Sequence, residues 1–175
     1  MDKGCIHIYE GDGKGKTTAS VGLAVRCAGS GQKVLFTQFL KGNSSNELNV
    51  LEQIPNLMVY RNEKEYGFVF CMDPEEKIEA KNYYREHFRE TIYYAKREHV
   101  RLLVMDELID AYTLGMVDPT EVQHFLLTKP DDMEVVMTGH SAPEELVHIA
   151  DYVTHMAKKK HPFDMGLSAR VGIEM

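Results

Sequence analysis

Cysteine is scarce in this chain, and its cysteines lie too far apart for the usual metal-ligand spacings. Cys5, Cys27 and Cys71 form no pair or cluster of the kind that binds zinc. We expect free thiols in a reducing cytoplasm, with Cys5 and Cys27 buried because both fall in apolar segments. The sequence also lacks a convincing Ser/His/Asp or Cys/His arrangement, so no nucleophilic side chain is indicated.

The chain also lacks a long apolar run and an excess of positive charge. No apolar stretch approaches the roughly 20 residues of a membrane-spanning helix, and we expect no signal peptide and a cytoplasmic location. The formal net charge of −7 does not indicate a nucleic-acid-binding surface. The 175 residues, 43% of them hydrophobic and 27% charged, are typical of a globular protein, and we expect one domain spanning residues 1–175.

Near its beginning the chain contains a phosphate-binding loop (P-loop) with one departure from the usual pattern. In G-x-x-x-x-G-K-[ST] the first position is Glu10 instead of glycine, whereas residues 15–17 match. The backbone N–H groups of such a loop point at phosphate oxygens, its lysine reaches the outer phosphates and its hydroxyl meets Mg²⁺. A β-prone run at residues 5–9 precedes the loop and a helical pattern at residues 18–28 follows it. This context favours a nucleotide site over a glycine-rich turn that binds nothing.

Strand and helix patterns alternate along the rest of the chain. Further strands are expected at residues 34–39, 57–60, 102–107, 134–139 and 152–156, the last as a buried strand, and further helices at residues 74–99, 119–127 and 142–150. Pro74 suits the first turn of its helix, and Ser141 is the expected N-cap of the last helix. Continuous apolar strands separated by helices predict an α/β, P-loop NTPase-like fold. Its mostly parallel sheet should be covered by helices on both faces.

Polar residues follow several of these strands, and in a parallel sheet such residues should meet at one edge. Asp106 and Glu107 end an apolar strand, as the carboxylates of a Walker B motif do. They would hold Mg²⁺ directly or through water; alternatively they are the acidic start of a helix, because residues 108–112 continue helically. Gln38 and Lys41 are suited to touch phosphate or ribose, and a solvated loop is equally consistent with them.

Other aromatic, basic and imidazole residues are less specific. Phe68 and Phe70 suit either the wall of a large flat ligand site or ordinary core packing, which the residues alone slightly favour. The basic run at residues 158–161 is expected to be a solvated face. His140 and His155 lack ligand spacing, so core or surface roles are expected rather than metal binding.

Taken together, several segments resemble the ATP:corrinoid adenosyltransferase family of the cobalamin pathway. They are Gly11 to Thr18, Gln38 to Gly42, Met105 to Leu108 and Lys160 to Asp164, and residues 166–175 look like the family's C-terminus. A P-loop occurs in many families, whereas this set in this order is specific, and the resemblance covers nearly the whole chain.

The resemblance implies adenosyl transfer instead of phosphoryl transfer. A Co(I) corrinoid attacks the 5′-carbon of ATP and triphosphate leaves, in adenosylcobalamin synthesis or salvage. Because cobalt supplies the nucleophile, no catalytic base is needed. The family binds ATP in the reverse sense to ordinary P-loop NTPases, and replacement of the first P-loop glycine, as by Glu10, is characteristic of it.

The resemblance also implies roles for individual residues. The ATP-binding positions would be Gly11, Asp12, Gly13, Lys14, Gly15, Lys16, Thr17, Thr18, Arg26, Gln38 and Lys41. Lys16, with Lys14, would neutralise the departing triphosphate, and Thr17 and Glu107 would hold Mg²⁺, or Mn²⁺ in its place, with Asp106 in support. Lys16, Thr17 and Glu107 are therefore the candidate catalytic residues.

Further implications concern the corrinoid and the partners. Phe68 and Phe70 match an aromatic loop that removes the lower axial ligand of cobalt and so eases its reduction. Arg26 matches an arginine near the nucleotide and the second subunit of a homodimer, and a flavoprotein reductase is the expected electron donor.

This chain also departs from the family pattern. Many members have Asn where Asp12 stands, Trp where Phe70 stands and Arg where His140 stands. An acid inside an anion site is unfavourable, so Asp12 should point outward or meet the metal. Longer members carry an N-terminal extension that helps close the site, which we do not expect here.

Two other functions stay open: a P-loop kinase acting on a small molecule, and a nucleotide-dependent corrinoid-binding protein without turnover. The lack of an evident arginine cluster for a lid weakens the kinase reading. The phosphorus-containing product distinguishes these three functions. Adenosyl transfer releases triphosphate, a kinase releases ADP, and a binding protein without turnover releases neither.

Overall fold

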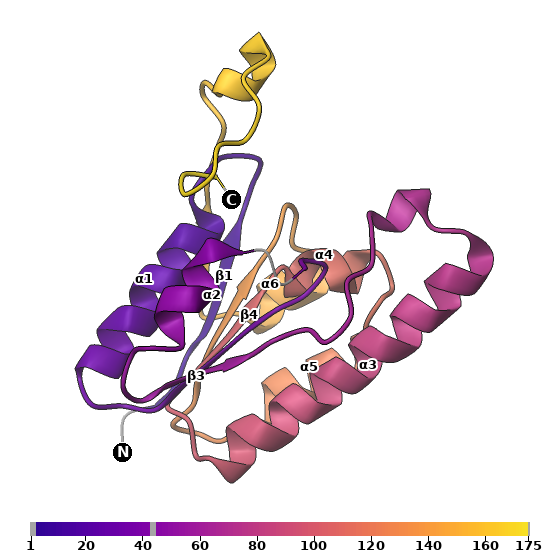
Figure 1. The fold of residues 1–175 in the computed structure, drawn as a ribbon. Helices are drawn as coiled ribbons and strands as arrows, with labels where there is room; N and C mark the ends of the chain where they lie inside the picture. Colours follow the sequence, from indigo (N-terminus) through magenta and orange to yellow (C-terminus); the bar gives the residue numbers. More distant parts are fainter. Residues whose placement is uncertain (1–2, 43–44, 175) are drawn as a thin grey trace.

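The sheet of this protein is a single parallel one, as seen in a computed structural model that describes residues 3–42 and 45–174. Its strands are β1 (Ile6–Glu10), β2 (Val34–Gln38), β3 (Leu57–Tyr60), β4 (Leu102–Asp106), β5 (Glu134–Thr138) and β6 (Tyr152–His155). They lie in the order β3-β2-β4-β5-β1-β6, and every pairing among the described residues is parallel. Figure 1 shows the sheet between two layers of helices, which confirms the predicted α/β architecture.

Helices cover both faces of the sheet. They are α1 (Lys16–Gly29), α2 (Asn46–Leu51), α3 (Pro74–Arg97), α4 (Leu108–Thr113), α5 (Pro119–Thr128) and α6 (Glu144–Ile149), with short 3₁₀ turns η1 (Val69–Cys71) and η2 (Pro162–Met165). Apolar residues of α1 and α2 share one core cluster with alternate residues of the strands, and those of α3 to α6 share the other. Side chains alternate across a strand, so the two-sided cover explains why β2 and β4 are buried throughout.

Local signals account for the longest helix. Asp73 accepts hydrogen bonds from the N–H groups of Glu75 and Glu76, and Glu76 bonds back to the N–H of Asp73. Pro74 occupies the first turn, where its missing N–H costs nothing, so the prediction for this residue is confirmed.

Two predictions at the level of elements were wrong, and one helix was not predicted. Ser141 does not cap α6: Pro143 precedes the helix, and the restriction that a proline places on the residue before it keeps Ala142 out of the helix. Strand β6 is exposed instead of buried, because it lies at the edge of the sheet and pairs with β1 alone. Helix α2, which was not predicted, follows β2.

The cysteines are less buried than predicted. Cys5 and Cys27 are only partly buried, Cys71 is exposed, and all are free thiols. Among the described residues, no helix combines the length and the apolar character that crossing a membrane requires.

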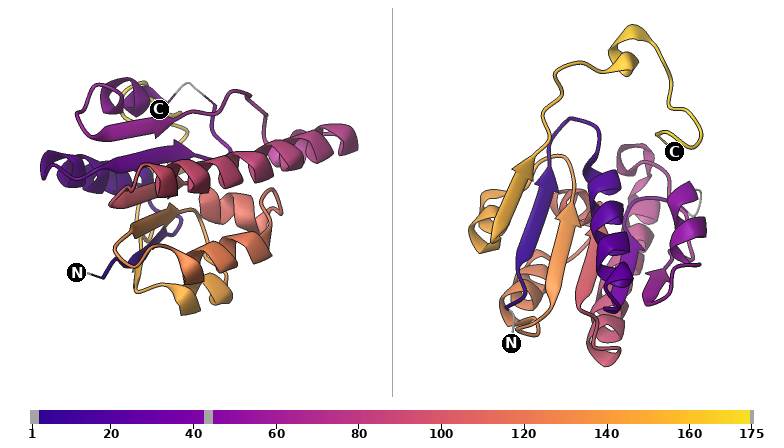
Figure 2. Two further views of the ribbon diagram at one scale, coloured as in Figure 1. Left: turned by 90° about the horizontal axis from the view of Figure 1, so that it is seen from below. Right: turned by 90° about the vertical axis from the view of Figure 1, so that its left-hand side faces the viewer.

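The chain after β6 leaves the sheet at the edge where the P-loop lies. Figure 1 shows this tail, residues 156–174, in yellow beyond the end of α1, and the right-hand view of Figure 2 shows it rising from the exposed edge strand. The tail therefore lies over the P-loop end of the sheet.

Candidate functional site

The predicted convergence at the carboxyl edge of the sheet is confirmed. Thr17, Gln38 and Lys41 all make hydrogen bonds to the carboxylate of Asp106 at the end of β4. The N–H of Gly11, after β1, donates to the carbonyl of His140, after β5, over 2.9 Å. Segments far apart in the sequence thus meet at one place because their strands run in the same direction.

The lysine of the P-loop lies inside its own loop. Lys16 Nζ donates to the carbonyl oxygens of Gly11 at 2.6 Å and Gly13 at 2.9 Å. Gly15 has φ 124°, a conformation that favours glycine, and Lys16 begins α1 directly after it. The ammonium group therefore lies at the N-terminus of a helix, where the helix dipole also favours an anion.

Two P-loop glycines pack against the start of the tail. A Cβ on Gly11 or Gly13 would come within 2.4 or 2.5 Å of the carbonyl oxygen of Met156, closer than atoms can approach. The N–H of Gly13 donates to this carbonyl over 2.7 Å. With the N–H of Gly11 bonded to His140, these two N–H groups have partners within the chain, whereas the N–H groups of the loop were expected to point at phosphate oxygens.

Asp106 is the centre of the polar network. Its side chain has no exposed surface and accepts hydrogen bonds from the hydroxyls of Thr17, at 3.0 Å, and Thr138, at 2.6 Å. Gln38 Nε2 donates to it over 3.1 Å and Lys41 Nζ over 2.7 Å. A buried carboxylate is stable only with such partners, so this network fixes the position of the Thr17 hydroxyl.

The ammonium group of Lys41 lies among three oxygen atoms, from Thr17, Asp106 and Glu107. It is 2.7 Å from Asp106 Oδ2, 2.9 Å from Thr17 Oγ1 and 3.5 Å from Glu107 Oε1. Burial alone would lower the pKa of Lys41, but the carboxylates of Asp106 and Glu107 outweigh it and raise that pKa. Lys41 therefore lies at the polar site instead of in a solvated loop, and its contact with phosphate or ribose stays a prediction.

A cation position defined by one hydroxyl and two carboxylates fits Mg²⁺, which prefers oxygen ligands and keeps several waters. Gln38 Oε1 is buried beside this position and has no hydrogen-bond partner among the described residues. Such an orphaned acceptor suits a water molecule bound to a metal ion.

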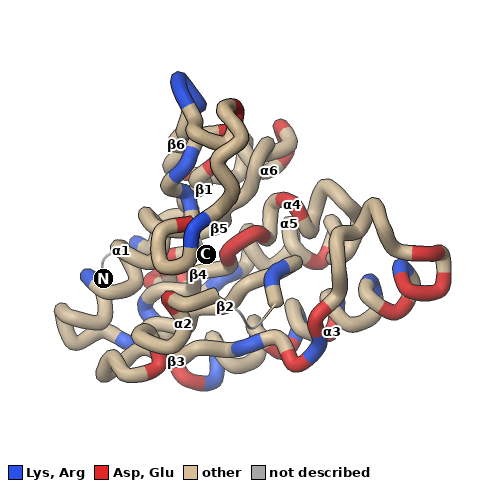
Figure 3. The backbone as a smooth tube through the Cα atoms, turned by 45° about the horizontal axis from the view of Figure 1, so that its top comes forward, with Lys and Arg blue, Asp and Glu red and all other residues tan. Residues whose placement is uncertain are grey.

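Glu107 has an unusual backbone and an unusual carboxyl group. Its φ of 61° is left-handed, and its N–H donates to Thr138 Oγ1 over 2.9 Å. Burial, opposed by Lys41 and assisted by Asp106 and Asp110, raises the pKa of its side chain to about 7. Figure 3 shows acidic positions gathered at the start of α4, where cations would relieve their repulsion.

Glu10 and Asp12 do not point into the P-loop. The carboxylate of Glu10 accepts the N–H of Ala142 at 2.7 Å and lies 2.9 Å from His155 Nδ1, so it joins β1 to its neighbours. Asp12 is exposed and accepts the N–H of Lys158 at 2.9 Å. Asp12 was expected either to point outward or to meet the metal, and the structure shows that it points outward.

Other predicted ATP ligands are less close. Lys14 Nζ lies 2.9 Å from Glu174 Oε1 at the end of the tail, and Thr18 is exposed in the first turn of α1. Arg26 is exposed in the last turn of α1, about 15 Å along the helix axis from Lys16. Within this one chain Arg26 is therefore not brought to the P-loop.

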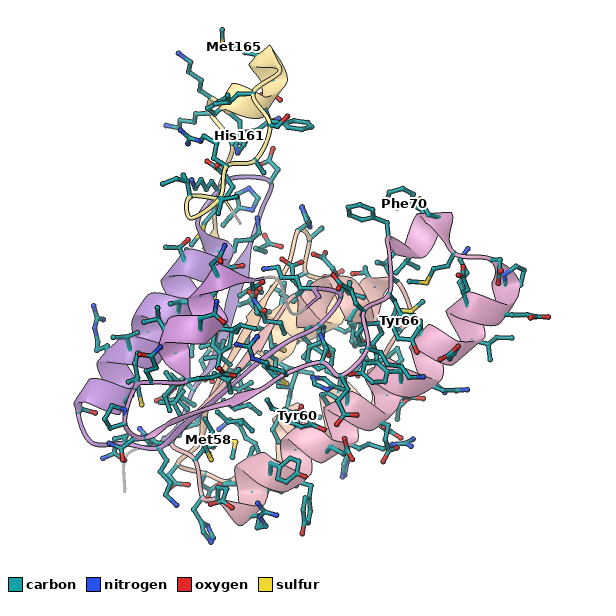
Figure 4. All side chains as sticks on the ribbon, in the orientation of Figure 1. Met58, Tyr60, Tyr66, Phe70, His161 and Met165 are labelled. Carbon is teal, nitrogen blue, oxygen red and sulfur yellow. The ribbon has the colours of Figure 1, made fainter. Side chains whose placement is uncertain are left out.

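The aromatic arm, residues 66–71, leads out to η1. Phe68 and Phe70 are 73% and 80% exposed and stack on each other with ring centroids 5.2 Å apart, so core packing is wrong for both. Tyr66 anchors the arm on α3 through the rings of Tyr83 and Tyr84. Figure 4 shows Tyr66 close to α3 and Phe70 at the outer end of the arm.

Comparison with known proteins decides the family. The model of the family described as ATP:corrinoid adenosyltransferase BtuR/CobO/CobP matches residues 2–175. The chain belongs to this family. The corrinoid adenosyltransferase of Escherichia coli K12 is 32% identical over an alignment of 178 positions, gaps included, that covers 99% of this chain and 86% of the relative. Corrinoid adenosyltransferase CobA of Salmonella typhimurium is 30% identical over 175 residues, with 99% and 86% covered.

Solved structures with low sequence identity show the same fold as this adenosyltransferase. A KaiC-like protein of Pyrococcus horikoshii has a TM-score of 0.56 at 14% identity, with 92% of this chain and 76% of that chain covered. ATPases 2 and 3 of EssC from Geobacillus thermodenitrificans give 0.52 at 18% identity, with 97% and 35% covered. These similarities support the P-loop fold alone.

Several residues of the candidate site were not predicted from the sequence. Thr138 was recognisable as a polar residue at the end of an apolar strand. Glu47, which accepts from Gln38 Nε2 at 3.1 Å, lies on the unpredicted α2. Asp110 and Glu174 carry no local signal, because their partners lie 30 and 160 residues away.

Proposed function

We propose that this adenosyltransferase acts through the P-loop and Asp106 network to move the 5′-deoxyadenosyl group of ATP onto Co(I) of a corrinoid. The observation that carries the proposal is the pair of ammonium groups at the sheet edge. Lys16 Nζ lies within the P-loop, and Lys41 Nζ lies against Thr17 and Asp106. Such a site suits a highly charged leaving group.

The step balances without a side-chain base. Co(I) supplies an electron pair to the 5′-carbon, a cobalt–carbon bond forms, and the carbon–oxygen bond to the triphosphate breaks. Triphosphate leaves with the electron pair of that bond, so its charge rises as it departs. The protein therefore acts by binding and orienting ATP and by stabilising this charge.

The residues of the P-loop are assigned different roles in phosphate binding. Because the N–H groups of Gly11 and Gly13 are already bonded, we assign phosphate contacts to Gly15, Lys16 and Thr17 at the start of α1. Lys16 exchanges its carbonyl partners for phosphate oxygens when ATP binds. Lys14 joins it once the carboxylate of Glu174 moves aside.

Mg²⁺ would be held by Thr17 and Glu107, with Asp106 orienting the Thr17 hydroxyl. When bound, the ion neutralises phosphate charge and so stabilises the departing triphosphate. Lys41 lies at this position and would be free to contact the phosphates if Thr17 and Glu107 held the ion instead. Mn²⁺, with the same preference for oxygen ligands, is expected to substitute.

The corrinoid is assigned to the exposed rings of the aromatic arm. Phe68 and Phe70 present a flat apolar surface, which suits a large planar ligand and the removal of the lower axial ligand of cobalt. We further propose a homodimer in which Arg26 meets the nucleotide of the second subunit. A flavoprotein reductase as electron donor, a cytoplasmic location and a single domain over residues 1–175 complete the proposal.

Product analysis tests this function. The full chain is incubated with Mg²⁺, ATP and a chemically reduced corrinoid, and the phosphorus products are identified by ³¹P NMR. We expect triphosphate together with a light-sensitive alkylcorrinoid. ADP in place of triphosphate would show a kinase, and binding without any product would show a carrier protein; either result overturns the proposal.

A further inference from the structure

A second group of possible metal ligands lies beside the Mg²⁺ position. Glu107, Asp110 and His140 each offer one ligand atom, and these atoms lie within 4.8 Å of one another. They come from the end of β4, the first turn of α4 and the segment after β5, so the carboxyl edge of the sheet brings them together. From the sequence, a core or surface role was expected for His140 rather than metal binding.

Backbone contacts hold this group in place. The N–H of His140 donates to Asp110 Oδ1 over 3.0 Å, while its ring nitrogen Nδ1 lies 2.8 Å from Asp110 Oδ2. Glu107 is held by its left-handed backbone and by the bond from its N–H to Thr138. Gly139, which precedes His140, packs so closely on Ile109 that an added Cβ would lie 2.6 Å from Ile109 Cβ. These contacts fix the start of α4 against the segment that carries His140.

The chemistry of the group differs from that of the Mg²⁺ position. Two carboxylates and an imidazole suit first-row transition ions such as Mn²⁺, Co²⁺ and Zn²⁺, whereas Mg²⁺ takes oxygen ligands. The side chain of His140 is 70% exposed, which leaves room for water or a substrate oxygen on the remaining coordination positions.

We propose that Glu107, Asp110 and His140 form a second divalent-cation site, selective for a transition metal, beside the Mg²⁺ position at Thr17 and sharing Glu107 with it. Glu107 lies between the two sites, since one of its oxygens is 3.5 Å from Lys41 Nζ. A metal ion here adds positive charge beside the P-loop, because the carbonyl of His140 accepts the N–H of Gly11. Metal binding at this second site does not depend on the proposed adenosyl transfer being correct.

The chain offers a matched control. His155 resembles His140: it is exposed, and its Nδ1 lies 2.9 Å from a carboxylate oxygen of Glu10. Among the described residues, however, this pair belongs to no group of three metal-binding side chains. If a histidine–carboxylate pair were enough to bind the metal ion, substitution of either histidine would weaken binding equally. The proposed three-residue site instead needs His140 and does not need His155.

The test uses the full chain, stripped with a chelator and free of nucleotide. Co²⁺ binding is followed by its visible absorption, and Mn²⁺ binding by EPR with the nitrogen coupling of a bound imidazole as the signature. We expect one such site that excess Mg²⁺ does not displace. His140→Ala and Asp110→Asn should each weaken it by at least about tenfold, and His155→Ala should not.

The variant His140→Arg distinguishes loss of the metal ligand from loss of positive charge at this position. Arginine supplies a positive charge but no ligand, so this variant should lose the nitrogen coupling and the Co²⁺ spectrum while its melting temperature stays near that of the parent. The proposal is overturned if no Co²⁺ or Mn²⁺ binds, if binding survives His140→Ala, or if His155→Ala weakens it equally. ATP binding in Mg²⁺, measured separately, reports on the proposed function and does not decide this site.

Discussion

The P-loop edge and the aromatic arm are built in opposite ways. At the edge, Asp106 is fully buried and holds Thr17 and Lys41 by hydrogen bonds. On the arm, Phe68 and Phe70 are mostly exposed, and their ring contacts are with each other. One region is held by internal hydrogen bonds before its ligand binds, and the other presents apolar surface that a ligand would cover.

The difference follows from what each region is proposed to bind. Charge that develops on a leaving group is stabilised best by groups already in position, because moving them during the reaction costs free energy. A large planar ligand instead needs accessible apolar area, and exposed rings gain free energy when it covers them. The contrast predicts that substitutions at the edge affect catalysis and that those on the arm affect corrinoid binding.

The largest effect is expected for Lys16→Ala. Loss of this ammonium group should lower kcat by about 10²–10³-fold, as removal of one preorganised charge-stabilising group does. Steady-state kinetics with reduced corrinoid measures it, and an unchanged melting temperature shows that the fold is intact. Lys14→Ala is the control and should lose less, because Lys14 is exposed and already paired with Glu174. Equal turnover of Lys16→Ala and the parent would contradict the assignment.

The next largest effect concerns the support beneath the arm. His87 is buried, stacks on Tyr60 and lies 2.7 Å from Thr37 Oγ1, and burial lowers the pKa of its ring to about 4. The unfolded chain takes up the proton near pH 6.5. Stability is therefore complete above that pH and falls as the pH drops toward 4, by up to about 3 kcal/mol.

Urea unfolding at several pH values between 4 and 8 measures this dependence. His87→Gln keeps a polar side chain without the titration, so its free energy of unfolding should change less over the same range. If the free energy of unfolding of the parent and of the variant falls equally between pH 8 and pH 4, protonation of His87 does not cause the loss of stability.

A smaller effect is expected on the arm itself. Phe68→Ala and Phe70→Ala should each weaken corrinoid binding by about five- to tenfold, the usual cost of removing an anchoring aromatic side chain. ATP affinity and the melting temperature should hardly change, because both rings are exposed. Leu127→Ala on α5, a residue 69% exposed, is the control. A large loss of stability would mean that the arm is a structural element.

The smallest effect is expected where the tail meets the P-loop. The carboxylate of Glu174 lies against Lys14 and, by its charge, competes with phosphate, so Glu174→Gln should raise ATP affinity by less than about fivefold. Titration calorimetry measures this change. Asp164→Asn, which alters a tail carboxylate paired with Lys158, should leave the affinity unchanged. Weaker ATP binding by Glu174→Gln would show that the tail assists binding.

Sequence reasoning succeeded where the signal is local. The strand before the P-loop, the helix after it and the acidic end of β4 each rest on a few neighbouring residues. It failed at β6, whose exposure follows from a place at the edge of the sheet and so depends on what surrounds the strand. The error at Ser141 was different, because the deciding residue, Pro143, is close in the sequence, and its restriction on Ala142 was overlooked.

The sequence by itself determined the α/β class, the P-loop and the family, because periodicity and motif spacing are properties of contiguous residues. Only the tertiary structure decided that Glu10 and Asp12 bond to the N–H groups of Ala142 and Lys158 instead of pointing into the P-loop, and that Lys41 lies among the proposed metal ligands. It also decided that His140 meets Asp110. These contacts join residues that only the parallel order of the strands brings to one edge, and no local pattern encodes that order.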